Sequence, residues 1–198
     1  MIDRAAIVVA AATPLEAREA RRALPGMRVV ETGVALRRAY EPLGDVVISC
    51  GLAGGLHHAH PTGTVIVPHE VARPNGEIVR CDAALSGALR AAARSLGLEP
   101  SEDRLVTTDA IVRGAQRDHW ASQGFAAVDM ETGLLRAQRV AAVRVILDTP
   151  LRELSEEWLR PVTAALKPWN WPELIWLART APRCARLAAQ VIARAFLP

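Results

Sequence analysis

The 198-residue sequence lacks most of the features that mark specialised classes of protein. Its three cysteines (Cys50, Cys81 and Cys184) are scattered and form no Cys-x-x-Cys pair, which argues against a disulfide framework and a zinc site. No uncharged apolar stretch is long enough to span a bilayer, and the first residues do not resemble a secretory signal. We therefore expect a cytoplasmic protein, either soluble or peripheral to the inner membrane face.

Further absences narrow the range of functions. No Gly-x-Gly-x-x-Gly follows the first apolar run, which disfavours a dinucleotide-dependent oxidoreductase. Only 4% of the residues are aromatic and no basic run is interleaved with them, so we expect no nucleic-acid partner. His57, His58 and His60 share one loop without clustered carboxylates or cysteines, so we interpret them as solvated residues and expect no metal.

What is present indicates one folded domain. Hydrophobic residues make up 51% of the chain and charged residues 23%, as is usual for globular proteins. The net charge of +3 arises entirely beyond Pro150, because residues 1–150 hold 17 basic and 17 acidic residues whereas residues 151–198 hold seven and four. We therefore divide the domain into an α/β core over 1–150 and a helical C-terminal extension over 151–198.

Short apolar runs alternate with helical segments along the core. Strands are expected over 6–12, 29–32, 45–50, 64–71, 105–112, 125–129 and 141–148, and helices over 14–24, 83–96 and 130–139. This alternation predicts an α/β sheet that is covered on both faces. Beyond Ser155 the sequence is predicted to be helical, with interruptions at Pro161, Pro168, Pro172 and Pro182.

Three of the expected strands end in glycine or polar residues. One runs into Gly51-Leu52-Ala53-Gly54-Gly55-Leu56, where glycines allow a ligand to approach the backbone closely. Another ends in Val128-Asp129-Met130-Glu131-Thr132-Gly133, and the last ends at Asp148. In open α/β sheets, strand ends of this kind form the ligand crevice.

These stretches resemble the nucleoside phosphorylase and methylthioadenosine nucleosidase superfamily, of the purine and uridine phosphorylase type. There the three strand ends read Gly-x-Ala-Gly-Gly-Leu, Val-Glu/Asp-Met-Glu and Arg-x-Ile-Ser followed by the catalytic aspartate. Ala12-Thr13-Pro14-Leu15-Glu16 and Thr108-Asp109-Ala110-Ile111-Val112 also fit, in family order, over roughly residues 5 to 150. The resemblance implies a single-domain, three-layer phosphorylase-type fold with a mixed central sheet flanked by helices, plus a helical C-terminal tail.

The resemblance also implies cleavage of the N-glycosidic bond of an adenine nucleoside. Asp148 would be the general acid that protonates N7 of the base, and apolar surroundings would raise its pKa for that role. Glu16 would position the attacking water. The alternative readings are a helix-capping aspartate and a glutamate that only complements a helix dipole. Leu147 departs from the family, which usually has a serine there to orient the aspartate.

The remaining site candidates would bind the substrate. Glu131 would accept hydrogen bonds from the ribose 2′- and 3′-hydroxyls, because a carboxylate offers one oxygen to each. Met130 would pack on the ribose unless it is core filler, and Asp129 would join it unless it is solvated. The others supply backbone groups to the sugar or wall the base, and they are Ala53, Gly54, Ile111 and Val112.

The nucleophile is left open between water and phosphate. The related phosphorylases have an early Gly-Asp-Pro-x-x-Arg phosphate loop where this chain has Glu16, whose carboxylate repels phosphate and favours hydrolysis. Arg37 and Arg38 are the best local cations if phosphate is a co-substrate. No other cofactor is expected.

The C-terminal extension bears on the substrate. Trp169, Trp171 and Trp176 precede a stripe of polar residues at helical spacing, a combination typical of helices on membrane surfaces. The stripe consists of Arg179, Arg183, Arg186, Gln190 and Arg194. The alternative is a helix packed on its own domain or on a dimer partner.

Within the superfamily the chain is most similar to the hopanoid-associated branch, on its short length, its long tail and the stretch from Asp148 to Arg152. That branch is thought to remove adenine from adenosylhopane. Methylthioadenosine, S-adenosylhomocysteine and futalosine are alternative substrates, and a catalytically inactive nucleoside-binding protein is an alternative function. The family resemblance implies a homodimer.

Overall fold

The computed structural model describes residues 4–38, 42–159, 164 and 166–197. Its sheet has the strand order β2-β1-β3-β8-β7-β5-β6, and β9 pairs with both β3 and β4. The strands are β1 (Ile7–Ala11), β2 (Arg28–Glu31), β3 (Val46–Gly55), β4 (Val65–Ile66), β5 (Glu70–Ala72), β6 (Ile78–Arg80), β7 (Arg104–Thr107), β8 (Phe125–Asp129) and β9 (Arg139–Asp148).

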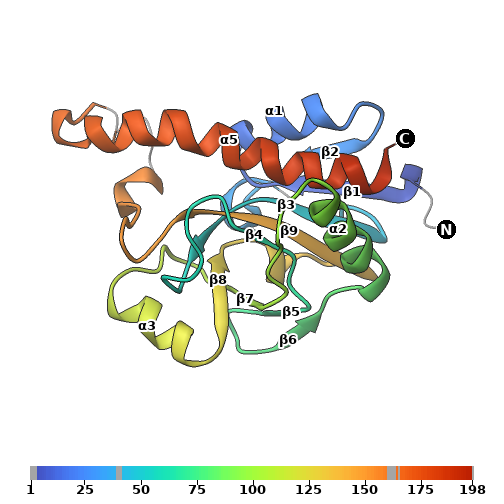
Figure 1. Ribbon diagram of the computed structural model, residues 1–198, viewed down its shortest axis with the longest axis horizontal. Helices are drawn as coiled ribbons and strands as arrows, with labels where there is room; N and C mark the ends of the chain where they lie inside the picture. The colour runs from blue at the N-terminus through green and yellow to red at the C-terminus, as the bar shows by residue number, and fades with distance from the viewer. Residues whose placement is uncertain (1–3, 39–41, 160–163, 165, 198) are drawn as a thin grey trace.

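Helices lie on both sides of this sheet. They are α1 (Pro14–Ala23), α2 (Ala83–Ser95), α3 (Ala115–Ser122) and α5 (Trp171–Phe196). In Figure 1, α5 crosses one face of the sheet beside α1 and α2, whereas α3 lies beyond β8 on the opposite side of the molecule. Parallel pairs (β1 with β3, β3 with β9) and antiparallel pairs (β3 with β8, β4 with β9) occur together. The predicted fold, a mixed sheet flanked by helices with a helical tail, is confirmed.

The two longest strands, β3 and β9, form the centre of the core. They pair in parallel from Val46 opposite Arg139 to Ala53 opposite Ile146. Their continuous apolar runs are buried on both faces, as expected for parallel strands covered by helices. At the end of the ladder Gly54 pairs with Asp148, so that Leu147 is bulged out of the register.

Several predicted elements need correction. The helix expected over 130–139 is wrong: a 3₁₀ turn (Thr132–Leu134) precedes β9. The Asp129 carboxylate accepts hydrogen bonds from the backbone N–H and hydroxyl of Thr132, and this local bonding competes with a regular helix. The expected strand over 105–112 stops at Thr107, and the strand over 64–71 is divided into β4 and β5. The strand β6 and the helix α3 were missed.

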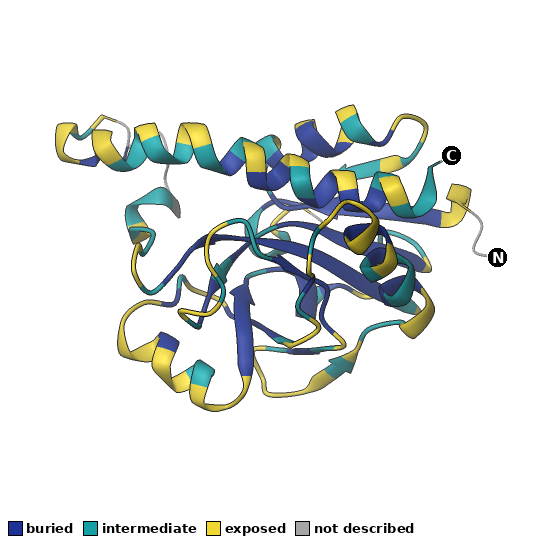
Figure 2. Ribbon diagram, viewed as in Figure 1, coloured by how far each residue is buried: buried dark blue, intermediate teal, exposed yellow. Residues whose placement is uncertain are grey.

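Helix α5 runs through Pro182, so the predicted interruption there is also wrong. A proline inside a helix costs about 3 kcal/mol. One face of α5 is nevertheless buried against α1, α2, β3 and β9, which keeps the helix continuous (Figure 2). Pro172 lies in its first turn and Pro168 begins a 3₁₀ turn (Pro168–Asn170), whereas Pro161 lies outside the described residues. No helix among the described residues has both the length and the apolar character needed to cross a bilayer.

Candidate active site

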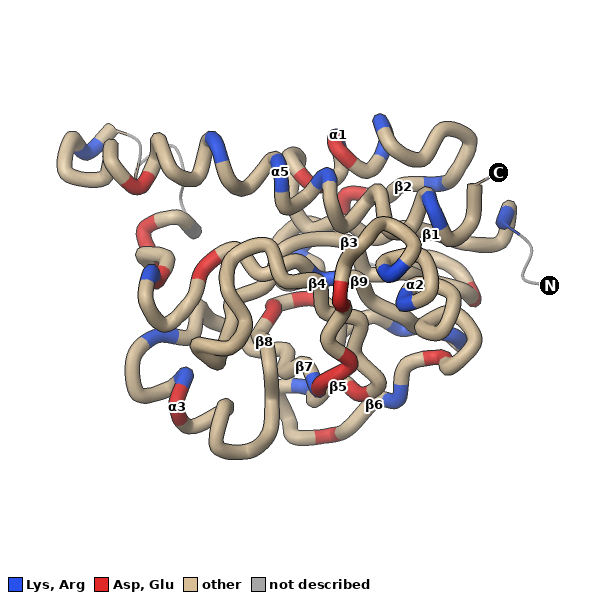
Figure 3. The backbone as a smooth tube through the Cα atoms, viewed as in Figure 1, with Lys and Arg blue, Asp and Glu red and all other residues tan. Residues whose placement is uncertain are grey.

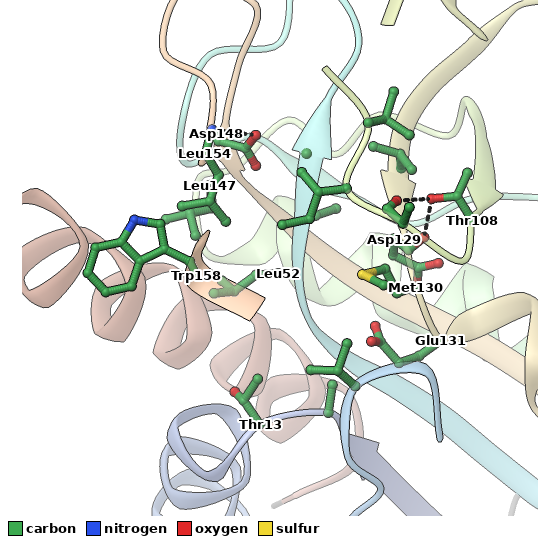
Figure 4. Close-up of a pocket in the computed structure, with 18 of the residues that line it drawn as sticks. Thr13, Leu52, Thr108, Asp129, Met130, Glu131, Leu147, Asp148, Leu154 and Trp158 are labelled. Atoms are coloured by element: carbon green, nitrogen blue, oxygen red, sulfur yellow. Dashed lines mark hydrogen bonds between the residues drawn. The ribbon is translucent and has the colours of Figure 1, made fainter. Parts of the chain in front are cut away.

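A cavity of about 240 Å³ opens where β1, β3, β8 and β9 end (Figure 4). Its lining includes all nine residues that the sequence assigned to the site, although they come from five separate segments of the chain. These residues are Glu16, Ala53, Gly54, Ile111, Val112, Asp129, Met130, Glu131 and Asp148. Figure 4 places the Asp148 carboxylate toward one end of the cavity and Glu131 with Thr13 toward the other.

The bulge in β9 brings Asp148 to the cavity. Side chains normally alternate between the two faces of a strand, yet the neighbours Leu147 and Asp148 both line the cavity because the register shifts beside them. Gly54 is the facing residue, and a Cβ on it would lie 3.2 Å from Asp148 Oδ1 and 3.1 Å from Val128 Cγ1. The second glycine of the strand end therefore gives the carboxylate the space it occupies.

Asp148 is buried and lies in mixed surroundings. Its Oδ2 atom accepts hydrogen bonds from the Arg117 guanidinium and, at 3.3 Å, from the Leu154 backbone N–H. Desolvation raises the pKa of Asp148 above its ordinary value, although the charge of Arg117 and these hydrogen bonds act in the opposite direction. A raised pKa favours the protonated carboxyl, which is the form that can act as a general acid.

Arg117 was missed by the sequence analysis. It projects from α3, is 2% exposed, and donates to the Gly55 carbonyl oxygen as well as to Asp148. Its Nε atom lies 3.2 Å from Glu153 Oε1. Nothing in the local sequence marks this arginine, because α3 has little amphipathic periodicity and its partners lie 31 or more residues away along the chain.

Glu16 lies in the first turn of α1 and lines the cavity. Thr13 caps α1 and forms a complete capping box with Glu16, in which Thr13 N–H and hydroxyl donate to Glu16 Oε2 at 2.8 and 2.7 Å. The Leu52 backbone N–H donates to Oε1 at 2.8 Å. Glu16 therefore joins α1 to the glycine-rich end of β3, which a simple helix-dipole partner would not do.

Arg144 lies at the Glu131 end of the site, where it binds the carboxylates. It is 1% exposed, and its Nη2 atom lies 2.8 Å from Asp129 Oδ2, 3.4 Å from Glu131 Oε2 and 2.6 Å from Ser49 Oγ. Asp129 is not solvated, as the sequence had allowed, because its side chain is fully buried and also accepts from the Thr107 hydroxyl at 2.6 Å. Its oxygens are thus occupied by protein donors beneath the cavity.

Glu131 is the most perturbed carboxylate at this end. Its pKa is raised to about 7, mainly by burial; the Arg144 charge opposes the rise, whereas the neighbouring Asp129 and Glu16 charges add to it. Its Oε1 atom accepts a hydrogen bond at 3.2 Å from the backbone N–H of Ala35, a residue with a φ of 53°. A non-glycine residue in the left-handed region is strained, and such strain often accompanies functional sites.

The walls of the cavity are apolar. Ile111 and Val112, which follow β7, contribute to the lining. Figure 4 shows Leu147, Leu154 and Trp158 together on one side of the cavity. The sequence placed Trp158 only in the C-terminal extension, because the turn that folds it back onto the cavity has no local signature. The cavity therefore has apolar walls and polar groups at its two ends, as small-molecule sites commonly do.

The polar end near Glu16 is negatively charged. Three carboxylates, those of Glu16, Asp129 and Glu131, act on the one buried guanidinium of Arg144. Arg38, a cation suggested for phosphate, pairs with Glu31 instead. The part of the chain that the structure describes contains no group of three or more His, Cys, Asp or Glu residues arranged to hold a metal ion.

Comparisons with known proteins agree with this architecture. The family model described as "Phosphorylase superfamily" matches residues 15–165. A mutant Helicobacter pylori 5′-methylthioadenosine/S-adenosylhomocysteine nucleosidase with 5′-methylthioadenosine in its active site superposes with a TM-score of 0.73 at 12% identity, covering 98% of each chain. The Neisseria meningitidis nucleosidase of the same name, in complex with methylthio-immucillin-A, has a TM-score of 0.71 at 18% identity, covering 96% of this chain and 97% of that one.

A third similar structure has a different named substrate. Futalosine hydrolase of Helicobacter pylori strain 26695 superposes with a TM-score of 0.72 at 13% identity, covering 97% of each chain. A search of curated protein sequences found no significant match. At these identities the similarity establishes a shared fold.

Proposed function

The chain belongs to the phosphorylase superfamily, and on this basis we propose that it cleaves the N-glycosidic bond of an adenine nucleoside. One observation carries the proposal. A buried carboxyl with a raised pKa (Asp148) and a carboxylate suited to a diol (Glu131) lie toward opposite ends of one apolar-walled cavity. This spacing of functions fits a base at the Asp148 end and a ribose at the Glu131 end.

The proposed reaction uses these groups as follows. Asp148 donates a proton to N7 of the departing adenine, which stabilises the leaving group. Glu131 accepts hydrogen bonds from the ribose hydroxyls and lies near the positive charge that develops on the sugar. Met130 and the backbone of Ala53 and Gly54 line the cavity between them. No cofactor takes part.

We propose water as the nucleophile. A phosphate dianion at the Glu16 end would meet three carboxylates and an arginine that is already paired with two of them. Coulomb repulsion in a buried site disfavours that arrangement, whereas a water molecule can donate hydrogen bonds to the same carboxylates. Glu16 would orient this water.

A nucleoside panel tests the function. The purified protein is incubated with adenosine, methylthioadenosine, S-adenosylhomocysteine and futalosine, each with and without phosphate, and the free base and sugar products are separated. Hydrolysis predicts free base and free sugar at rates that phosphate does not raise. Sugar phosphate would instead establish phosphorolysis. Binding without any base release would support the alternative of an inactive nucleoside-binding protein.

A lipid-linked adenine nucleoside such as adenosylhopane is a second candidate substrate. The support is a group of exposed apolar side chains around the start of α5, where the helix extends past the edge of the sheet (Figure 1). They are Leu151, Leu166, Trp169, Trp171 and Ile175, which are 53–83% exposed. Trp158, which lies between Leu151 and Leu166 in the chain, lines the cavity itself. We propose that this group meets a membrane surface, and, from the family resemblance, that the protein is a homodimer.

A further inference from the structure

We propose that Arg117 and Glu153 are positioning residues that hold Asp148 ready to donate its proton. The proposal rests on the proposed function, since it takes Asp148 as the acid of that reaction. It also explains how the site operates with Leu147, a residue that cannot orient the carboxyl by hydrogen bonding.

The three side chains form a chain of contacts at the base end of the cavity. The guanidinium of Arg117 donates to Asp148 Oδ2 and to the Gly55 carbonyl oxygen, whereas its Nε forms an ion pair with Glu153 Oε1 at 3.2 Å without a hydrogen bond. Glu153 is anchored in turn by the Gly114 backbone N–H, which donates to Oε1 at 2.6 Å. Two hydrogen bonds from separate nitrogens and the ion pair with Glu153 hold the guanidinium in place, and the guanidinium in turn orients the carboxyl that it binds.

This arrangement leaves one oxygen of Asp148 for the ligand. Arg117 and the Leu154 N–H both bind Oδ2, and Oδ1 lies over Gly54, which lines the cavity. The proton to be donated is therefore expected on Oδ1.

Glu153 solves an electrostatic problem that Arg117 creates. An arginine beside an aspartate normally lowers its pKa and keeps it ionised, which would remove the proton needed for catalysis. With Glu153 also ionised, the three groups carry a net charge of −1, and one added proton makes them neutral. Burial favours the neutral state. Asp148 is the more buried of the two carboxyl groups, with a side chain that is 9% exposed against 22% for Glu153, and burial raises its pKa.

The other charged groups nearby do not alter this balance. Arg113 lies 3.6 Å from Glu153 Oε2, but it is 45% exposed and screened by solvent. Arg152, on the same loop as Glu153, stacks over Trp176 at 4.2 Å from the ring centre. Arg117 remains the largest charge acting on Asp148.

Arg117 and Glu153 act on Asp148 both before and after the proton transfer. As the bond between the ribose carbon and the base nitrogen breaks, its electron pair moves to the base, and the proton moves from Asp148 Oδ1 to N7. Asp148 is left as a carboxylate, and the Arg117 guanidinium already bound to Oδ2 stabilises the new charge. Glu153 therefore favours the protonated reactant and Arg117 the ionised product.

Opposite shifts in titration test the proposal. Glu153→Gln should lower the titration midpoint of Asp148, and Arg117→Gln should raise it by about one pH unit or more. The midpoint is read by carboxyl ¹³C NMR, with the signal assigned through Asp148→Asn, and independently from the alkaline limb of kcat/KM against pH. Arg117→Gln should also lower kcat by about a hundredfold through misplacement of the acid.

Two more variants complete the design. Arg117→Lys keeps the positive charge but loses the planar set of donors of the guanidinium. We therefore expect kcat to fall without an upward shift of the Asp148 titration midpoint. Asp118→Asn, an exposed change of one charge on the same helix, should alter neither quantity. Glu153→Gln lies at a half-buried position, so it is expected to fold even if Arg117→Gln does not.

The proposal is overturned if Glu153→Gln leaves the midpoint unchanged or raises it, or if Arg117→Gln lowers it. The NMR titration needs no turnover. If the parent protein releases no base from any nucleoside, the proposed function fails, while the titration still decides whether the pair sets the proton on Asp148.

Discussion

Arg144 and Asp129 form a fully buried ion pair, with 2.8 Å between Nη2 and Oδ2 and side chains that are 1% and 0% exposed. The pair joins β9 to the end of β8, and the Ser49 hydroxyl adds β3 to the same contact at 2.6 Å. Removing one partner of such a pair typically costs about 3–5 kcal/mol, because the other charge is left buried. The ribose end of the site is therefore built into the sheet, and Glu131 is held on a rigid support.

Asp148→Asn should preserve the fold and lower the rate of base release by about a hundredfold, the usual scale for loss of a general acid. The amide can still accept from Arg117 but has no acidic proton to donate. The rate is measured by adenine release at saturating nucleoside, and circular dichroism checks the fold. Activity within a few-fold of the parent would remove Asp148 from the role of acid.

Glu131→Gln should reduce the preference for ribosides over 2′-deoxyribosides. A carboxylate can accept from both hydroxyls of the diol, whereas an amide has a single acceptor oxygen. The ratio of kcat/KM for adenosine and 2′-deoxyadenosine measures this preference in parent and variant. An unchanged ratio would mean that the diol is bound elsewhere.

The pH dependence of stability should also depend on Glu131. Burial raises its pKa from 4.5 to about 7, so between these values the folded protein keeps a proton that the unfolded chain has lost. The stabilisation is therefore present below pH 4.5 and is lost as the pH rises through 7. Glu131→Gln should remove this loss of stability with rising pH, which amounts to roughly 2–3 kcal/mol of unfolding free energy.

Urea unfolding at pH 4.5 and pH 8 measures the contribution of Glu131 to the free energy of unfolding. Exposed Glu99 provides the control, since Glu99→Gln should leave the difference between the two pH values as it is in the parent. If the unfolding free energy changes by the same amount between the two pH values in the parent and in Glu131→Gln, the raised pKa is contradicted.

Local chemistry explains how much of the site could be predicted from sequence. Glycines at the end of β3, the cap at Thr13 and carboxylates at the ends of β8 and β9 each reflect a constraint within a few residues. All nine predicted site residues line one cavity for this reason. Tertiary folding of α3 and of the segment after β9 brings three further residues to the site, namely Arg117, Glu153 and Trp158. The residue spacing within those two segments does not indicate this position.

The same distinction explains the errors in the fold. The stretch over 130–139 has helical composition, but Thr132 is bound to Asp129 and β9 already begins at Arg139. Pro182 predicts a break, but burial of Ala181 and Cys184 on either side holds α5 together. In both cases a contact made in the folded protein outweighs a local preference.

Gly51→Ala should reduce activity strongly. A Cβ at this position would lie 2.3 Å from Glu16 Oε1 and 2.7 Å from Arg144 Nη1, so both side chains must move. A displacement of that size can cost about a hundredfold in rate. Gly87→Ala is the matched control, because nothing lies within 4 Å of its Cβ in α2. That change should leave activity intact and add about 0.5–1 kcal/mol of stability. Full activity in Gly51→Ala would show that the contact between Glu16 and β3 is dispensable.

The C-terminal helix carries the prediction about the membrane surface. Its second half cannot be deleted without damage, because Ala188, Ala189 and Ile192 belong to the main core, so point changes must replace truncation. Trp176 is covered in part by Arg152, whereas Trp169 and Trp171 are 71% and 55% exposed. The stripe residues Arg179 and Arg183 follow on the same helix and are exposed. Figure 3 shows basic residues spaced along α5.

The double variant Arg179→Gln/Arg183→Gln should weaken binding to vesicles that contain anionic lipid. Each arginine near such a surface contributes about 1 kcal/mol, so the pair should lower affinity by roughly thirtyfold at low salt. Trp169→Ser/Trp171→Ser should weaken binding at all salt concentrations, since its effect is apolar. Arg4→Gln/Arg80→Gln removes the same charge from exposed positions outside α5 and serves as the control. Turnover of a soluble adenine nucleoside should be equal in all of these proteins. If the parent protein ignores anionic vesicles, or the control pair weakens binding as much as the tail pair, the membrane contact is excluded and with it the physical support for a lipid-linked substrate.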